Sequence, residues 1–370
     1  MLKYTEEGIL MTYNQLIENT IVPAVMAQDE KSKQYGKMVN YVNSVLPSKL
    51  YRFRTVTERS LSALYKDELW FANGSIMNDD FEARLYYDKK ELMNWLNSQI
   101  SDEGGLKVLE RVAGMDKMPV EIGKMIPNPI AFFETVKNMT RDQINELSSQ
   151  FIKFIAENLD EEVINATNRV REMTKFACFT EKINSDMMWG QYAASATGFA
   201  LEYNFGKQNT VVYHDERDTN FTIWCNLFPI IYGNKRMDTT QYAKYLFKVS
   251  MLQKVASWKG IIYPQYLLNL VVPCPDEFMA TKVAIKKSND WKQEKEWRMF
   301  YTTNNPVWGQ ERHSCVKQKA SAIYLGRKIS AINQKIIMDI AKEKNIPVFK
   351  MDFKESSKTY RLRSYKLEKT

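Results

Sequence analysis

Two carboxylates stand two residues apart in the stretch WKQEKEWRMF (291–300), at Glu294 and Glu296. In an extended strand, residues two apart project from the same face, so this spacing would bring like charges together at a cost in free energy. A solvated charge cluster accounts for the lysines of the stretch, but not for the paired carboxylates, which a site for acid/base chemistry would need. Arg298 follows in line with them and could neutralise Glu296.

Two arginines alternate with apolar residues in LYRFR (50–54). This alternation is typical of a strand and sends Arg52 and Arg54 to one face. Together they could bind an anionic ligand. The structural alternative is that they pair with acidic residues of the loop after residue 73, namely Asp79, Asp80 and Glu82.

The mid-chain stretch FACFTE (176–181) has the composition of a buried strand and carries Cys178 and Thr180. We interpret Cys178 as a small buried hydrophobe, because no histidine lies in a recognisable partner motif. The following MMWGQYAA places Trp189 and Tyr192 three apart, on one face of a helix. Such a pair either packs in the core or offers aromatic faces to a ligand.

Cysteine and histidine usage argues against a metal centre. The four cysteines are scattered without a CxxC spacing, and there are two histidines, which disfavours a zinc site and a disulfide framework. The chain also lacks GxGxxG and GxxxxGK[ST], the motifs of Rossmann and P-loop nucleotide sites. A net charge of +8 is compatible with nucleic acid, with a polyanionic ligand, or with no specific partner.

The sequence gives no sign of membrane association. No uninterrupted apolar run approaches the roughly 18–20 residues that a membrane span needs. The start, MLKYTEEGIL, has acidic residues where a signal peptide would have its apolar core. We therefore expect a cytoplasmic protein.

The elements that must position these residues form a mixed pattern. Residues 1–47 are predicted to be a helical N-terminal segment, and 48–370 an α+β domain with a helical insert at about 90–174. We expect a mixed, mainly antiparallel sheet. Within the insert, RDQINELSSQFIKFIAENL and EEVINATNRVREM are predicted as separate helices. Strands are predicted at 48–57, 68–73, 176–181, 198–205, 228–234 and 321–326, and in the closing IPVFKMDF and TYRLRSYKL.

An ordered set of motifs resembles a known family, the bacterial domain of unknown function 2971. The resembling stretches keep their order between about residues 50 and 365, and the helical parts at 1–47 and 90–170 resemble it least. They are LYRFR, LWFAN…MNDDFEARL, FACFTEKINSDMMWGQYAASATGFALEY, WKQEKEWRMF, AIYLGRKI and IPVFKMDF…YRLR. The family more often has a proline in place of Asp80, and its name carries no activity.

A basic residue on an early strand, a hydroxyl residue on a mid-chain strand and a late Glu-x-Glu are together similar to the Arg-Ser-Glu pattern of mono-ADP-ribosyltransferases. The resemblance implies NAD+ as a substrate, a fold of that kind and no metal. Arg52 would bind the pyrophosphate, Thr180 would supply the hydroxyl, Glu296 would be the catalytic carboxylate and Glu294 would serve the acceptor. Arg54, Trp189 and Tyr192 would complete the nucleotide site.

Three function classes stay open at this point. The first is an NAD+-using ADP-ribosyltransferase-like enzyme, which as a bacterial toxin or anti-phage defence effector would modify a protein or nucleic-acid target. The second is a Mg²⁺-dependent nuclease or phosphoesterase. The third is a non-catalytic module that binds a nucleotide or a partner protein. In the second class, the metal would be held by Asp79, Asp80, Glu82, Glu294 and Glu296.

Overall fold

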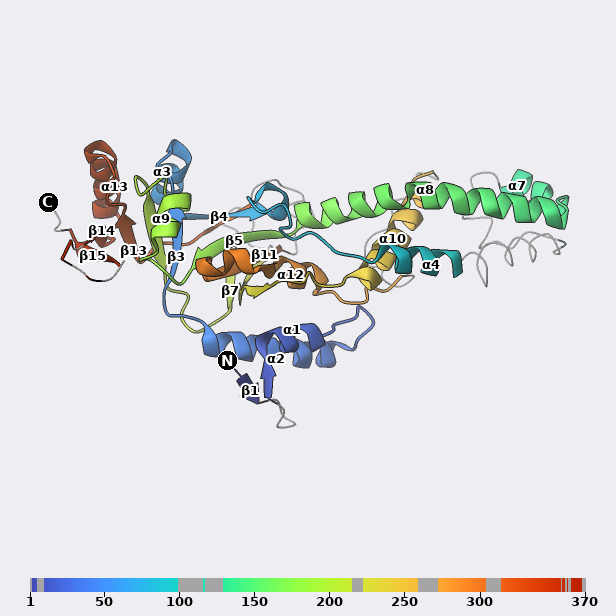
Figure 1. The fold of residues 1–370 in the computed structure, drawn as a ribbon, viewed down its shortest axis with the longest axis horizontal. Coiled ribbons are helices and arrows are strands. Elements are labelled where there is room, and N and C mark those ends of the chain that lie inside the picture. The colour runs from blue at the N-terminus through green and yellow to red at the C-terminus, as the bar shows by residue number, and fades with distance from the viewer. Residues whose placement is uncertain are drawn as a thin grey trace.

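A central sheet and a long helical arm define the shape of the molecule (Figure 1). The N-terminal helices α1 (Tyr13–Asn19) and α2 (Gln28–Val45) lie below the sheet in this view. The computed structural model describes residues 2–4, 10–98, 116, 129–214, 222–258, 272–303, 314–353, 355–356, 358 and 361–367.

One large sheet contains eleven strands. They are β3 (Leu50–Arg54), β4 (Glu68–Asn73), β5 (Lys175–Thr180), β6 (Phe199–Tyr203), β7 (Thr210–His214), β8 (Thr222–Pro229), β11 (Glu296–Thr303), β12 (Ser314–Lys317), β13 (Ala322–Leu325), β14 (Val348–Phe353) and β15 (Leu362–Lys366). Their spatial order is β15-β14-β13-β6-β3-β5-β11-β8-β7, with β4 beside β5 and β12 beside β4. Among the described pairs of this sheet, β13–β14 is parallel and the others are antiparallel. The predicted α+β class with a mixed, mainly antiparallel sheet is confirmed.

The helices surround this sheet and build the arm. They are α3 (Glu58–Tyr65), α4 (Lys89–Ser98), α7 (Pro129–Lys137), α8 (Arg141–Met173), α9 (Asp186–Tyr192), α10 (Thr240–Trp258), α12 (Met279–Ala284) and α13 (Ala331–Glu343), with the 3-10 turns η1 (Gly74–Ile76) and η3 (Asn289–Glu294). Several begin at capping boxes: at α3, Thr57 and Ser60 each accept a hydrogen bond from the other's backbone N–H. Among the helices of the described residues, none is both long enough and apolar enough to cross a bilayer.

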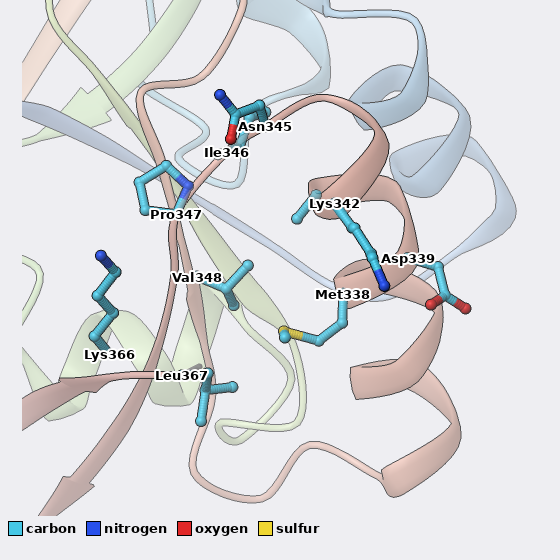
Figure 2. A pocket seen from close by; sticks show the side chains of 10 residues that line it. Met338, Asp339, Lys342, Asn345, Ile346, Pro347, Val348, Lys366 and Leu367 are labelled. Atoms are coloured by element: carbon cyan, nitrogen blue, oxygen red, sulfur yellow. The ribbon is translucent and has the colours of Figure 1, made fainter. Parts of the chain in front are cut away.

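Buried strands form the middle of the sheet. All five residues of β6 are buried, and so are the first five of β11, although β11 carries the charged Glu296 and Arg298 among them. At the β14 end of the sheet, α13 packs across the strands and leaves a cavity of about 250 Å³ between Met338, Val348 and Leu367 (Figure 2). This cavity contains none of the candidate residues.

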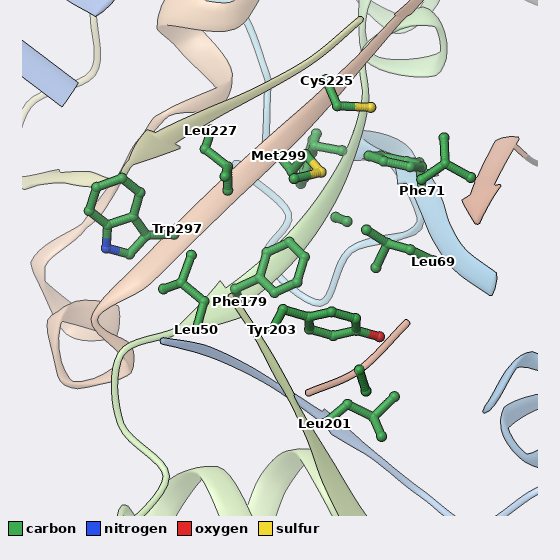
Figure 3. Packing of buried hydrophobic residues seen from close by; sticks show 14 of the residues in the cluster. Leu50, Leu69, Phe71, Phe179, Leu201, Tyr203, Cys225, Leu227, Trp297 and Met299 are labelled. Atoms are coloured by element: carbon green, nitrogen blue, oxygen red, sulfur yellow. The ribbon is translucent and has the colours of Figure 1, made fainter. Parts of the chain in front are cut away.

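The two faces of the sheet have different coverings. Leu50, Phe179 and Leu201 point into the main apolar cluster, which Figure 3 shows between the strands. Tyr51 and Phe53 alternate with Leu50 on β3 and therefore point to the opposite face. There they pack in a second cluster with α9. The sheet thus has one deep core and one smaller apolar layer under α9.

The N-terminal segment and the insert differ in part from prediction. Residues 1–47 are not all helical, because β1 (Leu2–Tyr4) and β2 (Leu10–Thr12) form an antiparallel hairpin before α1. The two helices predicted at 141–173 are one 33-residue helix, α8, since no glycine or proline interrupts the chain there. The stretch LKVLERVA lies outside the described residues, as does nearly all of MPVEIGKMIPNP.

Gly198 permits a close approach between β6 and β3. A Cβ at this position would lie 2.1 Å from the carbonyl oxygen of Arg54 and 3.0 Å from that of Ala193. Gly198→Ala is therefore expected to destabilise the protein by at least about 1–3 kcal/mol, because backbone must move to admit the methyl group. Thermal unfolding measures this effect. Gly190→Ala on α9 is the matched control and should not lower the melting temperature, because nothing lies within 4 Å of its added Cβ.

Candidate functional site

The large sheet is split beside β5. Strand β3 pairs with β5 only at Tyr51 and Thr180, whereas β4 pairs with the other end of β5 through Ala72 and Phe176. The described strands provide no partner on this side of β5 for residues 177–179. β3 and β4 thus diverge, and a pocket of about 320 Å³ opens between them. We call it the split-sheet pocket.

The split brings together side chains that an unbroken sheet would separate. The registers Tyr51–Thr180 and Glu296–Thr180 place Tyr51 and Glu296 on the same face. Arg52 and Arg54 point to the other face, because side chains alternate along β3. Arg52, Arg54 and Glu296 nevertheless all line the split-sheet pocket. The opening between β3 and β4 therefore joins the two faces.

One wall of the pocket is a chain of ion pairs centred on Arg298. The Arg298 guanidinium donates to Glu296 through Nε–Oε1 at 2.7 Å and Nη2–Oε2 at 3.1 Å. It also donates to Glu82 through Nη2–Oε2 at 2.7 Å and through Nη1. All three side chains are 5% exposed or less. This wall is a buried, alternating array of charges.

Lys287 on β10 (Lys286–Ser288) extends the array to Glu294. Its Nζ lies 2.7 Å from Glu294 Oε2 and 2.9 Å from Glu296 Oε2. The ammonium group also lies over the ring of Trp291, 4.7 Å from its centroid. Tyr192 donates its hydroxyl hydrogen to Glu294 Oε1 at 2.5 Å. The two carboxylates therefore share one cation, and α9 contributes a hydroxyl group to the same place.

The ion pairs of the array keep Glu296 and Lys287 charged. Burial alone would raise the pKa of Glu296, but Arg298 and Lys287 outweigh it and hold that pKa well below its ordinary value. Burial likewise would lower the pKa of Lys287, but Glu296 and Glu294 raise it above its ordinary value. Burial and the bond to Glu294 raise the pKa of Tyr192, so its hydroxyl remains a donor. Glu296 is thus a carboxylate, and Lys287 an ammonium, at neutral pH.

The prediction that one strand runs through Glu294 and Glu296 is wrong for the residues before Glu296. Glu294 ends the 3-10 turn η3, Lys295 takes a left-handed conformation with φ of 48°, and β11 begins only at Glu296. The two carboxylates meet because Lys287 bridges them, not because they share a strand face. Glu296 and Arg298 do share the strand face expected for them and form the predicted ion pair.

The opposite wall carries two arginines, Arg52 and Arg54, that have no carboxylate partner among the residues that the structure describes. Arg52 Nη2 donates to the carbonyl of Trp70 at 2.7 Å, and the guanidinium lies 5.8 Å from the ring centroid of Phe179. Its Nη1 is buried and has no hydrogen-bond partner among the described residues. Burial and the neighbouring Arg54 lower the pKa of Arg52 to about 9. An anion in the pocket would relieve both the desolvation and the repulsion.

Thr180 and Trp189 do not line the pocket. Thr180 Oγ1 donates to the carbonyl of Glu294 at 2.5 Å and accepts from the backbone N–H of Lys182 at 3.1 Å, so it fixes the turn before Glu296. Trp189 is 1% exposed and packs edge-on against Phe53, with a centroid distance of 4.9 Å. Of the predicted site residues, the structure brings together Arg52, Arg54, Tyr192, Glu294 and Glu296.

Sequence reasoning missed Lys287 and Trp291 as pocket residues. Lys287 is one of several lysines in KVAIKKSNDWKQEK, and no spacing distinguishes it from its neighbours. Glu82 was predicted as a partner for the early arginines or as a ligand of Mg²⁺, but it pairs with Arg298. Cys178 lies against Glu296, and burial, followed by this carboxylate, raises the pKa of its thiol. That environment fits the predicted inert cysteine.

The base of the helical arm touches the same site. Arg171, in the last turn of α8, is buried and donates through Nε to the carbonyl of Glu82 at 2.9 Å. Its Nη2 donates to the carbonyl of Gly74 at 3.2 Å. Arg171 thereby holds the loop that delivers Glu82 to Arg298.

The three glutamates of the pocket already hold protein cations. Arg298 and Lys287 stand between Glu82, Glu294 and Glu296, in the place where a metal ion would have to bind. Within the described part of the chain, no group of three or more histidine, cysteine, aspartate or glutamate side chains is arranged to hold a metal ion. The donor set thus fits an anion or a polar substrate better than Mg²⁺.

Comparisons with known proteins bear on the family only. No curated protein and no solved structure matches the chain. Residues 188–299 match the family described as "Protein of unknown function (DUF2971)", and this stretch includes Tyr192, Lys287, Glu294, Glu296 and Arg298. The resemblance predicted from the ordered motifs is thereby confirmed over residues 188–299, which are similar to the DUF2971 family.

Proposed function

We propose that the protein is an NAD+-using ADP-ribosyltransferase-like enzyme whose active site is the split-sheet pocket. One observation carries the proposal. The strands that bear Arg52, Thr180 and Glu296 are far apart in the sequence, yet they lie side by side as β3-β5-β11, and Arg52 and Glu296 line one pocket. The shared pocket supports the parts that the Arg-Ser-Glu resemblance implies for Arg52 and Glu296, whereas the hydroxyl of Thr180 lies outside it.

The arginine wall suits the pyrophosphate of NAD+. Arg52 presents a buried N–H group that has no partner within the described ranges, and Arg54 lies beside it in the pocket. A guanidinium binds phosphate oxygens through forked, charge-assisted hydrogen bonds. The depressed pKa of Arg52 indicates an unfavourable charge that a bound phosphate would stabilise.

The carboxylate wall suits the reacting ribose. In the proposed reaction, the bond between the anomeric carbon and the nicotinamide nitrogen breaks, and the electron pair leaves with nicotinamide. Positive charge then develops on the ribose, where the ionised Glu296 would stabilise it. To accept a hydrogen bond from a ribose hydroxyl, Glu296 Oε2 would exchange its contact with Lys287 for one with the substrate.

Glu294 and Tyr192 would act on the acceptor of the ADP-ribosyl group. An acceptor nucleophile forms the new bond to the anomeric carbon and loses a proton, which Glu294 would take as general base. The hydroxyl of Tyr192 holds Glu294 Oε1, so the carboxylate is oriented before the acceptor arrives. Thr180 plays a positioning part here, since it fixes the backbone carbonyl of Glu294.

An effector of this kind would be harmful in a growing cell. We propose that expression in bacteria arrests growth by modifying a target or consuming NAD+, as expected of a toxin or defence effector. The experiment that tests the proposed function is incubation of the purified protein with labelled NAD+ and a cell extract. Release of nicotinamide and transfer of label are expected. If NAD+ is neither cleaved nor transferred, a non-catalytic binding module becomes the better interpretation.

Arg52→Met is expected to abolish NAD+ binding without lowering the melting temperature of the free protein. The substitution removes a half-buried guanidinium that has no carboxylate partner in the described part of the chain, and it fills the space with an apolar chain. Thermal unfolding with and without NAD+ measures the effect. Wild-type protein should gain about 2.7 kcal/mol at about 100 times the Kd, and the variant should gain none.

Arg59→Met is the matched control for Arg52→Met. Arg59 also lies over an aromatic ring, 5.0 Å from the centroid of Trp70, but it is exposed and does not line the pocket. This variant should retain the full response to NAD+. If NAD+ stabilises Arg52→Met as much as the wild type, Arg52 does not bind the nucleotide.

A further inference from the structure

We propose that a second cavity beside the split-sheet pocket binds a single-stranded nucleic acid. Its role as the acceptor site rests on the proposed function, whereas the binding itself does not. The cavity measures about 930 Å³ and shares Asp79, Lys287 and Trp291 with the split-sheet pocket. We call it the outer chamber. A ligand held there would lie next to Glu294 and Glu296.

The outer chamber has cationic groups that no carboxylate neutralises. Arg84, Lys235 and Arg236 line it and are exposed. Arg236 donates to the backbone carbonyls of Arg84 and Leu85 at 2.8 and 2.7 Å, and none of the ion pairs in the described part of the chain involves these three cations. Burial and the nearby Arg84 lower the pKa of Arg236. Two adjacent arginines without an anion favour a phosphate ligand.

The acidic residues of the outer chamber are already engaged. Glu18 pairs with Lys286. Asp238 accepts from the backbone N–H and the hydroxyl of Thr240 at the start of α10, at 2.9 and 2.6 Å. Asp79 accepts from the backbone N–H of Phe81, and Asp290 from Ser288. Asp79, Asp238 and Asp290 keep their negative charge, because their donors are neutral, so the positive charge offered to a ligand is local to Arg84, Lys235 and Arg236.

Aromatic rings stand among these cations. Phe81 is 65% exposed and Tyr86 is 43% exposed, and the Arg236 guanidinium lies 5.5 Å from each ring centroid. Trp291 forms the wall shared with the split-sheet pocket. Cations that follow a phosphate backbone, together with rings on which bases stack, are the features by which proteins bind single strands without sequence preference. An acidic peptide would use the cations but not the exposed rings.

The strained residue Ala83 lies between two side chains, those of Glu82 and Arg84, that point into different cavities. Ala83 has a φ of 51°, a left-handed conformation that is uncommon outside glycine. On one side of it Glu82 points inward to Arg298, and on the other Arg84 points into the outer chamber. The backbone conformation at Ala83 thus lets one short segment serve both cavities.

Fluorescence anisotropy with labelled oligo-dT and oligo-rU of about 12 nucleotides tests the proposal. Wild-type protein should bind, with an affinity that falls as salt rises. Arg84→Glu, which loses no hydrogen bond of its side chain, and Phe81→Ala should each weaken binding about tenfold. Arg327→Glu is the matched control, since Arg327 also lies over an exposed ring, 5.4 Å from the centroid of Phe353, but outside this chamber.

Three outcomes would overturn the proposal: no oligonucleotide binding, equal binding by Arg84→Glu and the wild type, or preferential binding of poly-glutamate. The last would make an acidic protein the ligand. Oligonucleotide binding without transfer of label from NAD+ would support the outer chamber and count against the proposed function instead. Binding with transfer to the oligonucleotide would support both.

Discussion

Glu296→Gln is expected to lower kcat for NAD+ cleavage by about 10²–10³, or to below detection. The substitution keeps the size of the side chain and an acceptor oxygen for Arg298, but it removes the negative charge that would face the developing cation on the ribose. Because Arg52, and not Glu296, is proposed to bind the pyrophosphate, Kd for NAD+ should change little. Nicotinamide release and isothermal titration measure the two quantities separately.

Glu202→Gln is the matched control for Glu296→Gln. Both carboxylates are 5% exposed on central strands, and both hold a lysine. Glu202 also accepts from Tyr324 at 2.9 Å, but it does not line the split-sheet pocket. This variant should keep NAD+ turnover and toxicity. Turnover that survives in Glu296→Gln but not in Glu202→Gln would contradict the proposed active site.

Arg298→Met is expected to destabilise the protein by about 3–5 kcal/mol, which is large for a single substitution. The guanidinium is 1% exposed and holds both Glu82 and Glu296, so its loss leaves, among the described residues, Lys287 as the one cation within ion-pair distance of these two buried carboxylates. Chemical denaturation measures the loss. Adding Glu82→Gln to Arg298→Met should recover part of the stability, because one of the unpaired charges is then removed.

The pH dependence of unfolding supplies a second measure of the same array. The folded-state pKa of Glu296 lies below its ordinary value of 4.5, so the folded state favours the carboxylate. The stability that this group contributes is present above that value and is lost as the pH falls through the folded-state pKa. Arg298→Met should reduce this acid sensitivity. A variant as stable and as acid-sensitive as the wild type would show that the array adds little to folding.

Local patterns predicted the strands that carry the site, but not how those strands diverge. The alternation in LYRFR and the apolar run in FACFTE depend on neighbouring residues, and both stretches form strands where expected. The split between β3 and β4 depends on pairings across more than a hundred residues, which periodicity does not report. Lys287 is only seven and nine residues from the two glutamates, but its position between them depends on the pairing of its strand opposite Tyr232, which periodicity does not report either.

The wrong predictions also arose from patterns among neighbouring residues. The charged residues before Glu296 carry no hydrophobic period, so nothing in the sequence distinguished η3 and the left-handed Lys295 from a strand. Trp189 and Tyr192 were treated as a pair because they are three apart on α9. The structure separates them, since Trp189 packs on Phe53 while Tyr192 reaches Glu294. Spacing identifies a shared helical side but not which residue reaches the pocket.

The hydrogen bonds of Arg171 couple the helical arm mechanically to the split-sheet pocket. At 33 residues, α8 is roughly 50 Å long. Its far end lies near α7, well away from the sheet (Figure 1). Its near end holds the carbonyl of Glu82, whose side chain pairs with Arg298. A tilt of the arm about its base would therefore move Glu82 or break these hydrogen bonds. A force applied at the tip of the arm would thus reach the ion pairs that join Glu82, Arg298 and Glu296.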